Sequence, residues 1–288
     1  IDLASLFSLP EYIPWSRLRD SDDARFLGLV LPRILMRQPY QTQRGDFNGI
    51  CFKEKLGNNK ENVLWGNACF ALGAVLIREF ASVGWFSHIR GAPRDFLGGG
   101  LVTQFKPQSF GTDSPGVAKK YLTDVLITDN KEREISDLGF ISLSNNYDTP
   151  YATFHSNPSL QKAKKYTEYS ATLNAKLSAM LQHILCGSRF AHYIKVMLRD
   201  KVGSFITASD CEIFLQKWLN EYTTGRDDLD WETQALYPLR EGSVEVKEMP
   251  QKPGHYWSII HLKPHYQADH LVSELKLTTE LNQITSAA

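Results

Sequence analysis

The longest regular pattern of apolar and polar positions lies between Leu177 and Val202. Apolar or small residues recur there at alternating intervals of three and four, which is the spacing of one face of an α-helix. The other face is polar, with Gln182, Arg189, Lys195 and Arg199. The pattern predicts a long amphipathic helix whose apolar stripe is buried. We expect the stripe to place four residues in the interior: Met180, Ile184, Ala191 and Ile194.

Three other segments have helical patterns. Ser16–Gly28 has mixed charge and predicts a surface helix. Val63–Gly84 is apolar on nearly all sides, so we expect a helix that is buried on most of them. A third helix is predicted to end at Tyr222, with Thr207 or Ser209 as the N-cap that accepts from its first backbone amides.

Strand patterns alternate with these helices. Tyr121–Thr128 and Gly139–Leu143 are short predicted strands on either side of a charged turn. In the last third of the chain, Val244 and Val246 alternate with charged residues. A second alternating run follows the turn PQKPG, which predicts a β-hairpin.

The last alternating segment is Leu271–Leu281. Its apolar or small positions are Leu271, Ser273, Leu275, Leu277 and Leu281. Charged and polar residues lie between them, which predicts a half-buried strand. The outer backbone groups of such a strand are unpaired unless something covers them. We therefore expect the strand either to complete its own sheet or to pair with a neighbouring chain.

These elements together predict an α/β fold (α+β), with mixed sheets packed on long buried helices and a C-terminal hairpin followed by a terminal strand. We expect a first α/β region over residues 1–150 and a second over residues 151–288. The chain has 288 residues, which is enough for a substantial core. Its 32 basic and 32 acidic side chains cancel, so net charge predicts neither nucleic acid nor an anionic membrane as a partner.

Cysteine usage and hydropathy predict a soluble protein of the cytoplasm. The four cysteines have no CxxC spacing, which favours reduced core thiols. Ile1–Trp15 lacks the basic start of a signal peptide. The longest run without charge, Asn62–Ile77, has about sixteen residues, fewer than the roughly twenty that span a bilayer. We expect no direct membrane insertion.

Residue patterns predict no catalytic centre, metal or cofactor. Gly98–Gly100 lacks the Lys-Ser or Lys-Thr of a phosphate loop and favours a turn. Four histidines from His255 to His270 have no cysteine or carboxylate pair beside them, which favours core-edge side chains over a metal site. The aspartates from Asp227 to Asp230 lack the glycine and the closing glutamate of a calcium loop. The alternative that remains open is an α/β enzyme or small-molecule-binding protein with an unrecognised site.

Six longer sequence segments resemble those of a known protein family. They are LPRILMRQPY (Leu31–Tyr40), LWGNACFALGAVLIREFASVGWFSHIRG (Leu64–Gly91), ITDNKEREISDLGFISL (Ile127–Leu143), SRFAHYIKVMLRDKVGSF (Ser188–Phe205), YPLREGSVEV (Tyr237–Val246) and PGHYWSIIHLKPHYQADHLVSELKLTTEL (Pro253–Leu281). In this order they resemble the large subunit of the contractile sheath of bacterial type VI secretion, the TssC/VipB/EvpB family.

The resemblance implies a structural subunit, without catalysis or cofactor, that polymerises into a helical sheath and contracts to propel an inner tube. The implied partners are the small sheath subunit (TssB/VipA), further copies of the chain, the tube protein Hcp and the baseplate. A further implied partner is the ClpV unfoldase, which acts through a helix near the N terminus of the large subunit. The chain is similar to roughly the C-terminal three-fifths of such a subunit, a part that does not include this helix.

Two surfaces are candidate contacts. The charged side of the helix that ends at Tyr222 carries Asp210, Glu212, Lys217 and Glu221. These side chains either contact another sheath component or the tube, or form solvated surface. The resemblance also implies that terminal segments of neighbouring subunits form an intermolecular sheet. It assigns Leu271–Leu281 to β-strand addition, with an ordinary last strand of the domain as the alternative.

Overall fold

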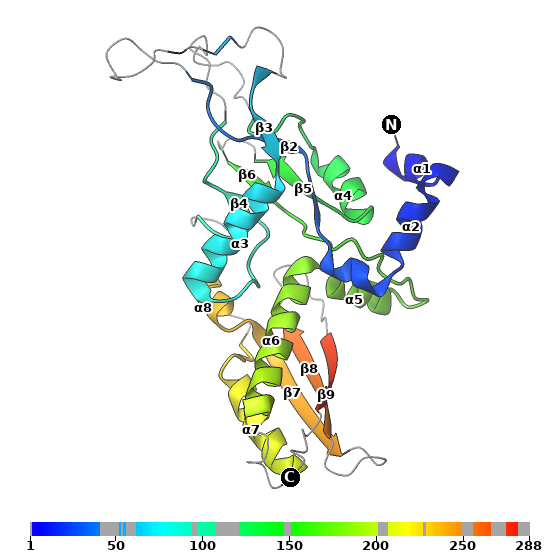
Figure 1. The fold of residues 1–288 in the computed structure, drawn as a ribbon, viewed down its shortest axis with the longest axis vertical. Coiled ribbons are helices and arrows are strands. Elements are labelled where there is room, and N and C mark those ends of the chain that lie inside the picture. Colours follow the sequence, from blue (N-terminus) through cyan, green and yellow to red (C-terminus); the bar gives the residue numbers. More distant parts are fainter. Residues whose placement is uncertain are drawn as a thin grey trace, which may run out of the picture. The chain divides into compact units, whose positions relative to one another are not determined.

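The computed structural model describes residues 2–40, 52, 54–55, 62–93, 97–107, 121–146, 151–200, 207–226, 229–248, 256–265 and 275–281. Contacts divide the chain into two compact units. Unit 1 is Ile1–Ala81 with His88–Lys162, and unit 2 is Ser82–Ser87 with Ala163–Ala288. Both units combine helices with mixed or antiparallel sheet, which confirms the predicted α/β class (Figure 1). The division at residue 150 stays a prediction.

Unit 1 is built on a sheet with the strand order β1-β5-β6-β4. Its strands are β1 (Leu29–Leu31), β4 (Leu101–Val102), β5 (Phe140–Asn145) and β6 (Ala152–Phe154). β1 runs parallel to β5, and the other pairs are antiparallel. A separate antiparallel pair joins β2 (Arg33–Leu35) to β3 (Trp65–Asn67).

The helices of unit 1 are α1 (Leu3–Phe7), α2 (Ile13–Arg19), most of α3 (Cys69–Val83) and α4 (Asp129–Asp137), with 3₁₀ turns η1 (Pro10–Tyr12) and η2 (Asp22–Phe26). On β5, Ile141 and Leu143 are buried on one face and the serines between and beside them are buried on the other. β5 is therefore covered on both sides. At its start, Phe140 stacks on Trp15 of α2, with ring centroids 5.1 Å apart.

The predicted helix Val63–Gly84 is shorter and more exposed than its pattern indicates. Its first residues form β3, and α3 begins only at Cys69, whose backbone amide donates to the Asn67 side chain at 2.8 Å. Phe70 and Ile77, expected to be buried, are 59% and 72% exposed. The spacing of apolar residues at intervals of three and four correctly predicted a helix. The apolar composition, however, overestimated how much of the helix surface is buried.

Three other local predictions in unit 1 are corrected. Residues 121–128 form no strand, because only Thr123 makes an isolated bridge to Ile34. The charged segment after them is not a turn but the helix α4. The predicted helix Ser16–Gly28 is interrupted: α2 ends at Arg19, and the 3₁₀ turn η2 follows.

Unit 2 packs helices on an antiparallel sheet with the order β7-β8-β9 (Figure 1). The strands are β7 (Leu239–Glu248), β8 (Tyr256–Pro264) and β9 (Leu275–Leu281), and the helices are α5 (Tyr169–Ser178), α6 (Leu181–Asp200), α7 (Ala208–Asn220) and α8 (Trp231–Leu236). The predicted hairpin and terminal strand are therefore present. The residues 271–274 of the predicted strand lie outside the described residues.

The core of unit 2 gathers apolar side chains from α6, α7, β7 and β8. Ile194 of α6 and Leu215 of α7 are fully buried in it. Trp85, from the short segment Ser82–Ser87, stacks on Phe190 of α6 with ring centroids 4.3 Å apart. The apolar stripe of α6 therefore lies against the core, as amphipathic helices do.

The predicted long helix divides into two. α5 ends at Ser178, α6 starts at Leu181, and Met180 lies between them, partly exposed. Ile184 and Ile194 are buried, whereas Ala191, expected in the interior, is partly exposed at the edge of the stripe. Phe190, one position earlier, occupies the core instead. The helix has 3.6 residues per turn, so positions chosen at alternating intervals of three and four do not all stay at the centre of the buried face.

We expect Ile194→Asp to lower the free energy of unfolding by about 3–5 kcal/mol, because it removes a buried side chain and buries an unpaired carboxylate. Urea denaturation followed by circular dichroism measures this change. The control is Lys195→Asp at the next, exposed position, which should change stability by less than about 0.5 kcal/mol. Equal stability of the two variants would contradict the packing of α6 described above.

Candidate functional site

The glycine cluster Gly98–Gly100 forms a structural turn. Gly99 has a φ of 61°, a conformation that favours glycine. A Cβ on Gly100 would collide with the carbonyl oxygen of Phe154, whose backbone amide donates to the Gly100 carbonyl at 3.0 Å. The guanidinium of Arg78 donates to the Gly99 carbonyl. Close backbone approach therefore explains these glycines without a bound phosphate.

Desolvation shifts the pKa values of several ionisable groups in unit 1. Burial raises the pKa of Glu79 and of Glu132, and lowers the pKa of His155. The Glu79 carboxylate lies 3.5 Å from the guanidinium of Arg78, which favours its charged form and partly offsets the effect of burial. Glu79 and Arg78 thus form a structural pair at the turn described above.

Across the described ranges, no three His, Cys, Asp or Glu side chains come together in a way that could hold a metal ion. Of the histidines considered as ligands, His265 is buried just after β8. His255 and His270 lie outside the described residues, as do Asp227 and Asp228.

Two cysteines are buried in unit 2. Burial raises the pKa of the Cys186 thiol to about 12 and that of the Cys211 thiol to about 11. Thiols that stay protonated at neutral pH are poor nucleophiles. Cys69 at the start of α3 is exposed, and Cys51 lies outside the described residues.

The helix α7 carries the four predicted contact residues, and two of them have structural roles. Thr207 is the N-cap, and its side chain accepts from the Asp210 amide while the Asp210 carboxylate accepts from the Thr207 amide, a capping box. The Glu212 carboxylate accepts from the backbone amide of Val246 at 3.0 Å. Asp210 therefore stabilises the start of α7, and Glu212 holds it to β7.

The other two predicted residues, Lys217 and Glu221, are exposed. The helical pattern places Ile213 with the apolar side chains of this helix, but it is 65% exposed. A surface that combines one apolar side chain with charges of both signs can form specific contacts that separate again. Ile213, Lys217 and Glu221 thus belong to the exposed part of this helix and its end.

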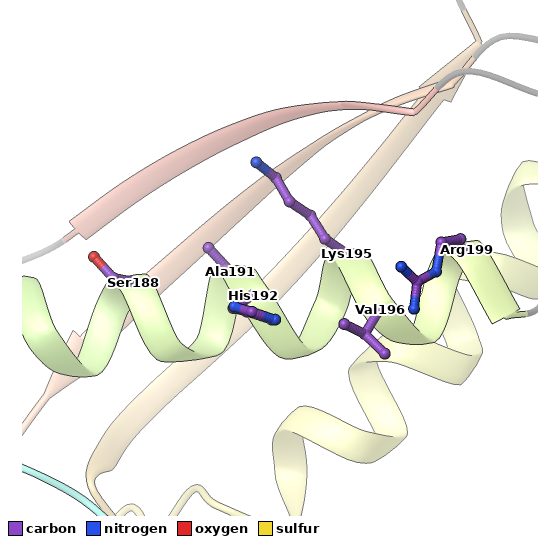
Figure 2. A pocket seen from close by; sticks show the side chains of 6 residues that line it. All are labelled: Ser188, Ala191, His192, Lys195, Val196 and Arg199. Atoms are coloured by element: carbon purple, nitrogen blue, oxygen red, sulfur yellow. The ribbon is translucent and has the colours of Figure 1, made fainter.

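A second charged surface lies on α6. A shallow hollow is lined by Ser188, Ala191, His192, Lys195, Val196 and Arg199 (Figure 2). Lys195 and Arg199 are exposed, and the Arg199 guanidinium lies 3.5 Å from the Asp200 carboxylate. The helical pattern placed these cations on a polar face, but it did not indicate the hollow.

The predicted terminal strand is the edge strand β9. It pairs antiparallel with β8, so that Leu277 lies opposite Ile260 and Leu275 opposite Leu262. In the portion of the chain that the structure covers, no further strand pairs with the outer side of β9. Leu271 and Ser273 lie outside the described residues. An edge strand of this kind offers backbone donors and acceptors to an added strand.

Comparisons with known proteins assign the chain to a family. Residues 1–161 match the family described as EvpB/VC_A0108, tail sheath N-terminal domain. Residues 170–281 match EvpB/VC_A0108, tail sheath gpW/gp25-like domain. The chain belongs to this tail-sheath family, and the predicted resemblance is confirmed.

A curated relative agrees with this assignment. The type VI secretion system sheath protein TssC1 of Pseudomonas aeruginosa is 37% identical over 282 residues, which cover 97% of the chain. They cover 56% of that protein, so the chain spans just over half the length of this relative.

The helices were also compared with the requirements of a membrane span. Among the helices that the structure describes, none combines the length and apolar character needed to cross a bilayer.

We expect Cys69 to react with iodoacetamide at pH 8 in the folded protein, while Cys186 and Cys211 react only after denaturation. Burial limits access to both, and a thiol with a pKa of about 12 is ionised to only about one part in ten thousand at pH 8. Mass spectrometry of the tryptic peptides measures each site. Rapid alkylation of Cys186 under native conditions would contradict its burial.

Proposed function

We propose that the chain is a structural part of a type VI contractile sheath, in which the subunit polymerises and contracts to drive an inner tube. The observation that carries this proposal is that tail-sheath domains match both units, and that the sheath protein TssC1 matches along nearly the whole chain. A structural role is favoured over the alternative of an enzyme, because the buried thiols and the glycine turn have structural explanations.

The proposed partners follow from this role. They are the small sheath subunit (TssB/VipA) and further copies of the chain, joined by a heterologous contact that does not close and so yields a helical polymer. Hcp, the baseplate and ClpV are further proposed partners of the whole subunit. No nucleic acid is proposed as a partner.

Coexpression of the full-length subunit with its small partner tests the proposal. Negative-stain electron microscopy of the purified complex should show tubules. A closed monomer or small symmetric oligomer, with no tubules under any salt condition tested, would contradict the proposed role.

We further propose that β9 links neighbouring subunits by accepting an added strand. The register supports this and identifies the backbone groups involved. The amides of Val244 and Val246 on β7 are bonded to α7 side chains, so they point away from β8. Their partners Ile260 and Ser258 must therefore direct their backbone groups toward β9.

The alternation then continues into β9. Leu277 lies opposite Ile260 and directs its backbone inward, to β8. The backbone groups of Lys276, Thr278 and Glu280 consequently point to the outer side of β9. These three residues form the edge to which a neighbouring strand would pair.

We expect Thr278→Pro to abolish tubules while the heterodimer with the small subunit stays folded, because proline removes an outward donor but no bond to β8. Electron microscopy and circular dichroism measure the two properties. Leu277→Pro is the matched variant: it removes an inward bond and should also loosen β9 from its own sheet. Normal tubules from Thr278→Pro would show that β9 is not the link.

The exposed charges of α7 are a second proposed contact, with another sheath component or with the tube. We expect Lys217→Glu combined with Glu221→Lys to impair secretion of the tube protein while the melting temperature stays within about 1 °C, because both side chains are exposed. Unaltered secretion in the α7 variant would identify these charges as solvated surface.

A further inference from the structure

The sheet of unit 2 has two edge strands, and they differ in what covers them. β9 forms one edge, as described above, and β7 forms the other. β7 runs over ten residues, Leu239–Glu248, with alternating buried and exposed positions in its second half. A long, regular edge strand is a template for pairing with another chain unless a protein covers it.

Side chains of α7 occupy the outer edge of β7. The Gln216 carboxamide binds two backbone groups: its oxygen accepts from the Val244 amide at 3.0 Å, and its nitrogen donates to the Gly242 carbonyl at 2.9 Å. The Glu212 carboxylate accepts from the Val246 amide at 3.0 Å. These are the same outward groups that an added strand would use.

The geometry of helix and strand matches along this contact. Residues four apart on a helix are separated by about 6 Å along its axis, and residues two apart on a strand by about 6.7 Å. Glu212 and Gln216 can therefore reach Val246 and Val244 in turn, with α7 lying alongside β7 in the opposite direction (Figure 1).

Two further contacts complete the cover. The segment after α7 closes the start of β7: the Leu239 amide donates to the Tyr222 carbonyl at 3.2 Å, and the Thr224 amide donates to the Leu239 carbonyl at 2.9 Å. Glycine at position 242 allows the close approach, because a Cβ there would lie 2.6 Å from Cδ2 of Leu219.

We infer that Glu212 and Gln216 close the β7 edge against strand addition and so direct an incoming strand of a neighbouring sheath chain to β9. This inference rests on the proposed function only for the identity of the incoming strand. The closed edge itself rests on the three hydrogen bonds to β7. Glu212 is on this account not a partner contact but a determinant of which edge a partner can use.

Glu212→Ala combined with Gln216→Ala tests the inference in the full-length subunit, copurified with its small partner. The background is Thr278→Pro, in which the β9 edge is blocked. Hydrogen exchange at Val244 and Val246 should accelerate at least tenfold, and light scattering should show self-association of the heterodimer as the concentration rises. A folded, monodisperse double variant at every concentration at which the background is monodisperse would overturn the inference.

Two controls separate edge closure from other roles of α7. Glu212→Gln keeps a carbonyl oxygen that can accept from the Val246 amide, so this variant should stay monodisperse. If the charge of Glu212 acted instead as a partner contact, Glu212→Gln would have the same effect as Glu212→Ala. Lys217→Ala with Glu221→Ala alters the exposed side of the same helix and should leave the exchange of Val244 unchanged. Self-association of either control would overturn the inference.

Two outcomes need a separate measurement. If the double variant fails to fold, Glu212→Ala alone leaves both bonds of Gln216 in place, and the same two measurements decide the question. If Thr278→Pro forms normal tubules, the proposed link through β9 fails. Hydrogen exchange at Val244 and Val246 in the Glu212→Ala, Gln216→Ala variant of the otherwise unmodified chain then still tests closure of β7.

Discussion

Stacking of Trp85 on Phe190 is the contact on which the architecture of unit 2 depends. Trp85 belongs to a six-residue segment, Ser82–Ser87, that lies between two stretches of unit 1 in the sequence. Its ring packs 4.3 Å from Phe190 and also approaches Tyr222 after α7, with centroids 5.2 Å apart. The Arg189 guanidinium lies over the Trp85 ring, which adds a cation–π contact. One side chain thus joins α6, the end of α7 and a distant part of the chain.

Local signals predicted the helix α7, the hairpin and the terminal strand of unit 2. The cap at Thr207, the alternation of Val244 with Val246 and the terminal leucines each depend on neighbours in sequence. The failures arose from distant partners. β3 forms because Trp65–Asn67 pairs with β2, about thirty residues earlier, and a helical period in one window does not contain that information.

The candidate site shows the same limit. A helical pattern separates charged from apolar faces, so it identified Asp210, Glu212, Lys217 and Glu221 as one polar side. It did not reveal that a backbone amide 34 residues later would meet Glu212. Sequence therefore predicts which side chains are polar, whereas their division into structural and available groups depends on the tertiary contact between α7 and β7.

Gln216 illustrates how a single side chain can restrict evolution. A carboxamide offers a donor and an acceptor from one planar group, and Gln216 uses both on the backbone of β7. A carboxylate in its place would lose the donor, an ammonium group would lose the acceptor, and asparagine would be shorter by one methylene. Homologous chains with this sheet should consequently vary less at position 216 than at the exposed neighbour Lys217, even though both positions are polar.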